Sequence, residues 1–299
     1  MSGASGPVAA RAGETLSDLL ARPLAPALYL VATPIGNLAD ISLRALSVLA
    51  RADLIAAEDR RHSKKLLSHF GIGGATCAYH EHNAERERPR LIARLRAGQS
   101  VALISDAGTP LVSDPGYKLA REALDAGIAV VSIPGPSAAL AALTSAGLPT
   151  DTFLFAGFLP PKPGPRRARL EELRNVPATL IFFETGPRLA KSLADMADVL
   201  GAREGAIAKE LTKLHESVTR GELSELVDVL SGDALKGEFA IVVGPPEEAA
   251  SDASDAAIVE QLEKALNVES FRDAVRSVAE VLQVSRARVY ELGLKLKRK

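Results

Sequence analysis

Short runs of apolar or β-branched residues alternate along the chain with longer stretches whose apolar positions recur at helical spacing. Continuous apolar runs are typical of strands buried on both faces, and their alternation with helices is typical of parallel βαβ units. The pattern therefore predicts an α/β fold. The predicted strands are Leu28–Ala32, Leu54–Ala57, Val101–Ser105, Val130–Ile133, Phe153–Ala156, Thr179–Phe183, Ala206–Ala208 and Phe239–Val243.

Local capping preferences predict where several helices begin. Ser137 precedes an apolar run and is the expected N-cap of one helix, and Gly186-Pro187 is expected to open another. Asp114 is expected to cap a helix whose first position is Pro115. These positions place the helices between the predicted strands, as βαβ units require.

A break in the pattern near Gly147-Leu148-Pro149-Thr150 divides the strand–helix units into two sets. Two α/β domains, residues 27–147 and 148–247, are the favoured arrangement for a chain of 299 residues. A single (β/α)₈ barrel is the alternative that periodicity leaves open.

The two ends of the chain differ from this pattern. Residues 1–26 are rich in Ala, Gly and Pro and are expected to be a flexible extension. After the acidic, Ala-rich linker Pro246–Asp255, residues 256–299 are expected to form a small helical segment with a basic end. From Arg286 onward it carries six basic residues against one acid. An RNA contact and a solvated, dimer-stabilising tail are both open interpretations of that end.

Composition and charge set limits on the class of protein. Hydrophobic residues make up 47% and charged residues 24%, so a core can form without disulfides. Cys77 is the single cysteine, which excludes an internal disulfide framework and a cysteine-based zinc site. No apolar run approaches the roughly 20 residues of a membrane span. The net charge of −1 neither supports nor excludes a nucleic-acid partner, because basic and acidic residues cluster in different segments.

The loops that follow the predicted strands are rich in glycine and proline. Ligands of open α/β sheets bind beyond the carboxyl ends of the strands, where glycine allows close approach of the backbone and proline restrains the loop. A tight turn is the alternative for any one loop, but four together favour a binding site. They read Thr33-Pro34-Ile35-Gly36-Asn37, Asp106-Ala107-Gly108-Thr109-Pro110, Pro134-Gly135-Pro136-Ser137 and Glu184-Thr185-Gly186-Pro187.

Absent motifs narrow the class of ligand. The chain has no P-loop, no Gly-x-Gly-x-x-Gly after the first strand and no Gly-x-Ser-x-Gly nucleophile elbow. Phosphate gripping, ordinary dinucleotide binding and serine hydrolase chemistry are therefore disfavoured. A ligand held by backbone groups, an aspartate and apolar surface remains.

A longer set of motifs resembles one family. The run Leu28–Ile41 is similar to the first motif of the small-subunit ribosomal RNA methyltransferase I family, which belongs to the tetrapyrrole methylase superfamily. The resemblance spans about Leu28 to Gly244 in order, with no large gap. It continues through Ala56–Ser63, His80–Asn83, Ser105–Gly116, Ile133–Ala138, Phe155–Pro160, Glu184–Arg188, Lys209–Glu216 and Gly237–Gly244.

The resemblance implies two α/β domains, with S-adenosylmethionine bound in the cleft between them, and a homodimer. It also implies a cytoplasmic enzyme that methylates the ribose 2′-oxygen of a cytidine in the decoding region of 16S ribosomal RNA, in the small ribosomal subunit. Two other functions stay open. One is a methylase of a porphyrin-like small molecule, against which Thr33–Asn37 and His80–Asn83 argue. The other is a non-catalytic ribosome-assembly protein that binds RNA.

By match to the family motifs, both domains are expected to contact the cofactor. Asp106 suits this role because an ionised carboxylate accepts hydrogen bonds from amino and hydroxyl groups, and a turn residue is its alternative. Ser137 would start a helix whose N-terminal amides favour a carboxylate, with simple capping as an equally good account. The expected contacts are Pro34, Asp106, Thr109, Ser137 and Ala138 from the first domain, and Phe183, Leu211 and Phe239 from the second.

Methyl transfer to a hydroxyl requires the hydroxyl to lose its proton, and a positioned base contributes roughly 10²–10⁴-fold to such a step. Glu58, with Asp59 beside it, and Glu210 are the candidate bases. Lys209 is the candidate for stabilising the developing alkoxide. A helix cap is the alternative for the Glu58-Asp59 pair, and an interdomain ion pair is the alternative for Lys209-Glu210.

Two further features carry open interpretations. Tyr79-His80-Glu81-His82-Asn83 places two histidines around an acid, as zinc sites do, but no third ligand is evident and no metal is expected. The stretch is interpreted as a polar loop that faces the methyl acceptor. Arg60 stands where related enzymes usually have threonine, and with Arg61 it is either a phosphate contact or a solvated surface pair.

Overall fold

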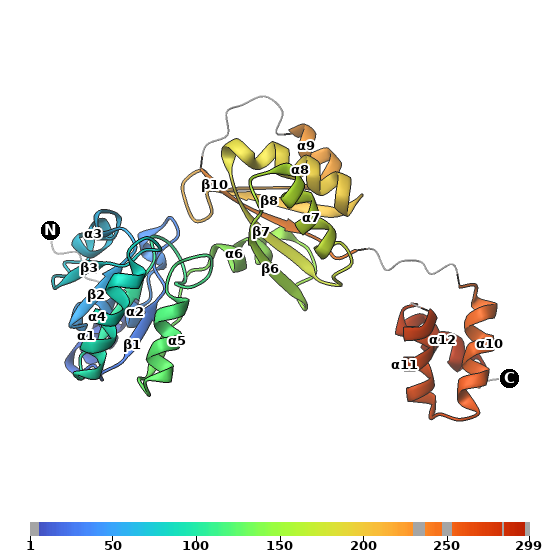
Figure 1. The fold of residues 1–299 in the computed structure, drawn as a ribbon, viewed down its shortest axis with the longest axis horizontal. Helices are drawn as coiled ribbons and strands as arrows, with labels where there is room; N and C mark the ends of the chain where they lie inside the picture. The colour runs from blue at the N-terminus through green and yellow to red at the C-terminus, as the bar shows by residue number, and fades with distance from the viewer. Residues whose placement is uncertain (1–5, 230–236, 247–252, 283, 297–299) are drawn as a thin grey trace.

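The computed structural model describes residues 6–229, 237–246, 253–282 and 284–296. Two α/β units and a bundle of three helices follow one another along the chain (Figure 1). The middle of the predicted acidic linker and the last basic residues, 297–299, lie outside the described ranges.

The first unit is a parallel sheet with the strand order β3-β2-β4-β1-β5. Four of its strands coincide with predicted apolar runs. The added edge strand is short and only partly buried, so its sequence carries little strand pattern. The strands are β1 (Leu28–Val31), β2 (Leu54–Ala57), β3 (Thr76–Ala78), β4 (Val101–Ile104) and β5 (Val130–Ile133).

Helices cover both faces of this sheet, which is why its central strands are apolar on both sides. One face packs against α2 (Leu43–Arg51) and α3 (Arg60–His69). The other packs against α4 (Ala84–Arg96) and α5 (Tyr117–Asp125). A short 3₁₀ helix, η1 (Leu38–Asp40), follows β1.

The N-terminal segment differs from the expected flexible extension. Residues Pro7–Ala21 form helix α1, which begins at a proline in its first turn and contacts α2. None of its residues is buried. The helix therefore rests on the intrinsic helix propensity of its residues and not on a buried apolar stripe. The Ala-, Gly- and Pro-rich composition of residues 1–26 did not indicate a helix.

The second unit is a mixed sheet with the order β6-β7-β10-β8-β9. Only β6 and β7 pair in parallel, and the other three pairs are antiparallel. The prediction of parallel units is therefore wrong for most of this sheet, because a buried apolar run does not encode strand direction. The strands are β6 (Phe153–Phe158), β7 (Thr179–Thr185), β8 (Glu204–Lys209), β9 (Ser217–Glu222) and β10 (Glu238–Val243).

Three helices cover one face of the second sheet, namely α7 (Pro163–Leu173), α8 (Gly186–Leu200) and α9 (Leu223–Val229). The opposite face packs against α6 (Ala138–Ala146), which precedes the predicted boundary near Gly147. The small side chains of α6 lie against alanines of β8 and β10. By packing, α6 therefore belongs to the second unit, and the chain crosses between the units at Pro134–Ser137.

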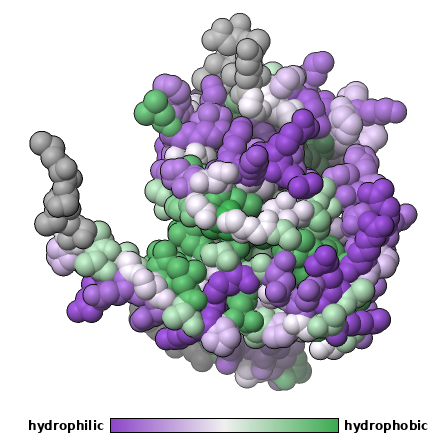
Figure 2. All heavy atoms as spheres, turned by 90° about the vertical axis from the view of Figure 1, so that its left-hand side faces the viewer, coloured by the Kyte–Doolittle hydropathy of each residue, from purple (hydrophilic) through white to green (hydrophobic). Residues whose placement is uncertain are grey.

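The C-terminal segment forms three helices around a core of their own. They are α10 (Asp255–Leu266), α11 (Phe271–Leu282) and α12 (Arg286–Leu296), which agrees with the helices expected there. No helix within the described ranges is long and apolar enough to cross a membrane. Viewed from the side of the first sheet, hydrophilic residues dominate the periphery, and hydrophobic residues gather near the centre of the face (Figure 2).

Candidate functional site

The loops beyond β1, β4 and β5 are joined by hydrogen bonds at the carboxyl edge of the first sheet. The backbone of Thr33 and that of Gly108 exchange two hydrogen bonds, with N···O distances of 2.8 and 3.0 Å. The Thr109 hydroxyl donates to the Pro136 carbonyl at 3.1 Å. Three loops predicted from their glycine and proline content thus form one continuous, braced surface.

Ser137 caps α6 as predicted. Its side chain accepts from the backbone N–H of Leu140 at 3.5 Å. The first turn of α6 therefore lies where the loop from β5 meets the second sheet, and its N-terminal amides point toward the loops of the first unit. The capping role is confirmed, while a cofactor contact from Ser137 stays a prediction.

Three adjoining cavities lie between these loops and the second sheet, and we call them together the interdomain cleft. Ile35 from the first unit and Glu238 from the second line all three. The cleft lining contains all eight predicted cofactor residues. They are Pro34, Asp106, Thr109, Ser137, Ala138, Phe183, Leu211 and Phe239.

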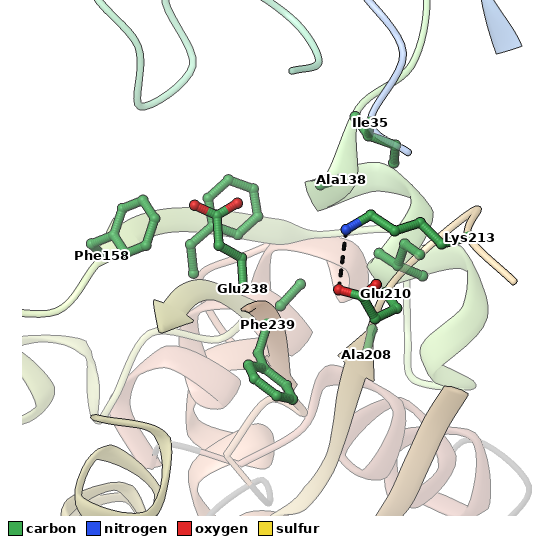
Figure 3. A pocket seen from close by; sticks show the side chains of 11 residues that line it. Ile35, Ala138, Phe158, Ala208, Glu210, Lys213, Glu238 and Phe239 are labelled. Atoms are coloured by element: carbon green, nitrogen blue, oxygen red, sulfur yellow. Dashed lines mark hydrogen bonds and ion pairs between the residues drawn. The ribbon is translucent and has the colours of Figure 1, made fainter. Parts of the chain in front are cut away.

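The apolar part of the cleft comes mainly from the second sheet. Phe183 contacts Phe155 and Phe158, with ring centroids 4.8 and 5.7 Å apart. Ala208 and Leu211 lie nearby, beside Ala138 of α6. Figure 3 shows Phe158, Ala138 and Ile35 around this space, with the Glu238 carboxylate directed into it. This part of the cleft therefore combines apolar side chains with the carboxylates of Glu210 and Glu238.

The side chains of Lys209 and Phe239 face away from this part of the cleft. They are paired residues of β8 and β10, and the lysine Nζ lies 6.0 Å from the Phe239 ring centroid. That ring is buried in the core with α7, α8 and α9, on the opposite face of the sheet from α6. Because strand side chains alternate, Phe239 presents its backbone to the cleft, and Lys209 does not line it. The contacts of Lys209 therefore give no support to the alkoxide role, which stays a prediction.

Glu210 does line the cleft, but it is engaged in an ion pair. Its carboxylate lies 3.1 Å from the Lys213 ammonium (Figure 3). Glu210 and Thr212 both have positive φ angles, 52° and 66°. A loop held in such strained conformations is typical of functional sites. Lys213, which sequence reasoning did not single out, also lines the cleft.

The loop after β8 touches the loop after β1 at a glycine. A Cβ atom on Gly36 would lie 2.5 Å from the Lys213 Cγ and 3.0 Å from the Leu211 carbonyl oxygen. Only a residue without a side chain allows this approach of the two units. Gly36 therefore fixes how closely the cleft closes at this end.

The neighbouring residues Glu58 and Asp59 have different positions in the structure. Asp59 caps α3 by accepting from the Arg61 N–H at 2.7 Å, and this hydrogen bond lowers the pKa of its carboxyl group. Glu58 does not cap that helix but lines the cleft beside Asp106. Burial raises the pKa of Glu58. The capping alternative is thus confirmed for Asp59, and Glu58 remains available for chemistry.

Asp114 is a cleft residue that sequence reasoning assigned to helix capping. The structure starts α5 at Tyr117, with Gly116 at its N-cap, so the predicted cap at Asp114 is wrong. Burial, with neighbouring carboxylates, raises the pKa of Asp114 to about 6. Leu111 and Ser113 have φ angles of 73° and 63°, and this irregular backbone delays the helix. The family resemblance at Ser105–Gly116, which includes Asp114, was the sequence feature that could have indicated its place in the site.

The His80–Asn83 loop lies beside Glu58 and is organised by Asn83. The Asn83 side chain accepts from the His80 N–H at 2.8 Å and donates to the Ala78 carbonyl at 2.9 Å. His82 and Glu81 line a further cavity that also contains Glu58. Across the residues that the structure describes, no three His, Cys, Asp or Glu side chains are grouped to hold a metal ion.

Arg60 is exposed and its Nε donates to the Thr76 hydroxyl at 3.1 Å, while the Arg61 side chain is 96% exposed. The pair therefore lies on the surface of α3. His62 and Lys65 of the same helix line the cleft end near Pro34. This face of α3 brings positive charge to the rim of the site.

The sequence matches the family described as Tetrapyrrole (Corrin/Porphyrin) Methylases over residues 27–227. Relatives called Ribosomal RNA small subunit methyltransferase I include one from Mesorhizobium japonicum, 61% identical over 241 residues, covering 80% of this chain and 82% of the relative. Another from Erythrobacter litoralis is 49% identical, covering 94% of this chain and 99% of the relative. One from Vibrio cholerae is 44% identical over 90% and 95%.

Solved structures share the fold at lower sequence identity. A diphthine synthase matches with a TM-score of 0.58 and 20% identity, over 73% of this chain and 89% of the other. A uroporphyrin-III C-methyl transferase from Thermus thermophilus, complexed with S-adenyl homocysteine, matches with a TM-score of 0.51 and 20% identity, over 73% and 97%.

Proposed function

The chain belongs to the tetrapyrrole methylase family, and on this premise we propose that it transfers a methyl group from S-adenosylmethionine to ribosomal RNA of the small subunit. The names of its relatives support this substrate class. We propose more specifically that the acceptor is the ribose 2′-oxygen of a cytidine in the decoding region of 16S ribosomal RNA. The observation that carries the proposal is the cleft, whose lining combines apolar side chains with carboxylates and loop backbone groups.

The residues of the cleft suit S-adenosylmethionine, which supplies an electrophilic methyl group on a positively charged sulfur. Phe183 and Leu211 offer apolar surface for the adenine ring. Asp106 and Glu238 offer acceptor-only carboxylates for hydroxyl and amino groups, and their charge favours a cation. The amide groups at the start of α6 favour the carboxylate of the amino-acid portion. Each part of the molecule thus has a chemically matched surface.

We propose Glu58 as the general base. It lines both the cleft and the adjoining cavity that His82 and Glu81 also line, and this position between two cavities supports the proposal. Its raised pKa makes its ionised form a stronger base than an ordinary glutamate. Glu210, by contrast, lies at the apolar end of the cleft and is neutralised by Lys213. Glu58 would take the proton of the acceptor hydroxyl.

A porphyrin-like substrate with several carboxylates is disfavoured by the charge of the site. Glu58, Asp106, Asp114 and Glu238 line one cavity together, and the other three interact electrostatically with Asp114. The carboxylates of a porphyrin-like substrate would be repelled by these four carboxylates, and the repulsion is stronger in partly buried surroundings. A neutral acceptor such as a ribose avoids that cost.

Assembly and location are part of the same proposal. We infer a homodimer in the cytoplasm, acting on the small ribosomal subunit, because the family resemblance implies each of these. Sedimentation equilibrium of the purified protein tests the dimer. A mass equal to one chain at micromolar concentration would contradict it.

The decisive experiment incubates the protein with radiolabelled S-adenosylmethionine and small subunits that lack the modification, followed by nucleoside mapping. Label in a single 2′-O-methylcytidine is the expected result. Label on a base, or no label, would overturn the proposed acceptor. Calorimetric binding of the cofactor without any methyl transfer would instead indicate a non-catalytic assembly protein.

A further inference from the structure

A second cavity adjoins the interdomain cleft, and we call it the tyrosine cavity. Glu58, Ser113 and Asp114 line both it and the cleft. Tyr79 and Tyr117 also line it. Its volume of about 650 Å³ lies within the roughly 300–1,000 Å³ that sites for small molecules occupy. The cavity is therefore large enough for one nucleoside and continuous in its lining with the cleft.

We propose that the tyrosine cavity receives one nucleotide of the substrate RNA, drawn out of its strand, with its ribose toward Glu58. This inference rests on the proposed function and adds the place where the acceptor binds. Enzymes that do chemistry on a base draw the nucleotide out of the stack into a pocket, and unstacked bases of single-stranded RNA are bound by stacking on aromatic side chains.

Tyr117 provides the stacking surface. It is the first residue of α5, and 68% of it is exposed although it is a large aromatic side chain. It lines the cavity together with His82. Tyr79 also lines the cavity but is only 1% exposed, and its hydroxyl interacts with Arg88. The cavity therefore offers one exposed aromatic ring, that of Tyr117, on which a planar base can stack.

The charges of the cavity select the part of the nucleotide that enters. Glu58, Glu81, Glu85 and Asp114 line it. Carboxylates accept hydrogen bonds from ribose hydroxyls and from the exocyclic amine of cytosine, and they repel phosphate. Lys118, exposed in the same lining, is placed to meet a phosphate of the flanking backbone. The base and ribose therefore enter, and the phosphates stay outside.

The backbone beside Asp114 gives the cavity a fixed shape. Gly116 has a φ angle of 136°, and a Cβ atom there would lie 2.7 Å from side-chain carbons of Leu103 and Leu111. The glycine lets the loop turn tightly before α5 begins at Tyr117. Asp114 and Tyr117 are thereby presented on the same lining before any substrate arrives.

The test compares Tyr117→Ala and Tyr117→Phe with the wild-type protein and with Leu124→Ala. Leu124 is 57% exposed on the same helix and is not part of the cavity lining, so it serves as the matched control. Methylation of unmodified small subunits gives kcat and KM, and calorimetry gives the Kd for S-adenosylmethionine. Thermal unfolding verifies that each variant is folded.

Tyr117→Ala is expected to lower kcat/KM for small subunits by about 5- to 150-fold, the range found when an aromatic–base stack is removed. The Kd for S-adenosylmethionine should stay within twofold. Tyr117→Phe keeps the ring and should remain within threefold of the wild type, as should Leu124→Ala. A general structural defect would impair both kcat/KM for small subunits and the Kd for S-adenosylmethionine, so a loss in kcat/KM alone indicates a contact with RNA.

Two outcomes overturn the inference while leaving the proposed function intact. One is an active wild type with equal kcat/KM for Tyr117→Ala. The other is a parallel loss of cofactor binding in that variant, which would assign Tyr117 to the cofactor site. A wild type that binds S-adenosylmethionine but does not label small subunits would refute the proposed function itself, and the inference with it.

Discussion

The backbone N–H of Asp106 donates a hydrogen bond to the Glu58 carboxylate, with the nitrogen and Oε2 3.4 Å apart. The Asp106 carboxylate in turn accepts from the N–H of Asp59 at 3.0 Å. These reciprocal contacts join the loop after β2 to the loop after β4. They hold a predicted cofactor residue, Asp106, and a candidate base, Glu58, in one hydrogen-bonded unit.

Asp106→Asn should weaken S-adenosylmethionine binding by about 10- to 100-fold. The amide oxygen can still accept from Asp59, so the loop is retained, while the charge in the cleft is lost. Hydrogen bonds to charged groups contribute roughly 1.5–3 kcal/mol, which gives the expected size. Isothermal calorimetry measures the Kd. Asp151→Asn, an exposed aspartate outside the cleft, is the control, and an unchanged Kd for Asp106→Asn would refute its binding role.

Glu58→Gln should lower kcat by roughly 10²–10⁴-fold, the contribution of a positioned base, and change the cofactor Kd by less than threefold. Wild-type kcat should rise with pH through the raised pKa of Glu58, because only the ionised form accepts a proton. The kcat of Glu58→Gln should not show this rise with pH. Glu210→Gln should have the smaller effect on kcat. The reverse order would return the role of base to Glu210.

Asp114→Asn should stabilise the protein at pH 8 but not at pH 4. The pKa of Asp114 is raised from 3.8 to about 6, so the folded state holds a proton that the unfolded state releases between these values. Stability from this group therefore falls as pH rises through that window. A shift of this size is about 3 kcal/mol, which solvent screening of a partly exposed group reduces to about 1 kcal/mol.

Urea unfolding of wild type and Asp114→Asn at pH 4, 6 and 8 measures that difference. The gain in the free energy of unfolding should be small at pH 4 and largest at pH 8. A gain that does not depend on pH would mean that charge burial is not its cause.

Gly36→Ala should impair the approach of the two units. Its Cβ would meet the Leu211 carbonyl oxygen and the Lys213 side chain, and such overpacking costs roughly 1–3 kcal/mol. The expected result is a weaker Kd for S-adenosylmethionine by about tenfold. Gly73→Ala is the matched control, because nothing lies within 4 Å of its added Cβ and its φ is ordinary. Equal Kd values for the two variants would contradict the contact.

Removal of residues 253–299 should leave the Kd for S-adenosylmethionine unchanged, because the cleft lining comes from residues 33–240 and the three helices have their own core. Binding to small subunits should weaken, and its dependence on salt should become shallower, because basic residues of α12 are lost. Filter binding at several salt concentrations measures both. An unchanged slope would favour the interpretation of this segment as a dimer-stabilising tail.

Local pattern was enough for most of the secondary structure. Eight apolar runs coincide with strands because burial on both faces leaves a continuous signature in the chain. Ser137 was identified as an N-cap because its hydrogen bond to Leu140 spans only three residues. The edge strands β3 and β9 were missed because a partly buried edge strand lacks that signature. The eight predicted cofactor residues came from family motifs, and the structure brings them to one cleft.

What the sequence determined by itself was therefore most of the elements, their order and the glycine- and proline-rich loops that follow the strands. Only the tertiary structure decided which way side chains face and which units they join. Lys209 turns away from the cleft because Ala208 faces α6 and neighbouring strand residues alternate. Asp114 and Glu238 enter the site through contacts between segments far apart in the chain. Such contacts depend on register and packing across the whole molecule, which no short stretch of sequence encodes.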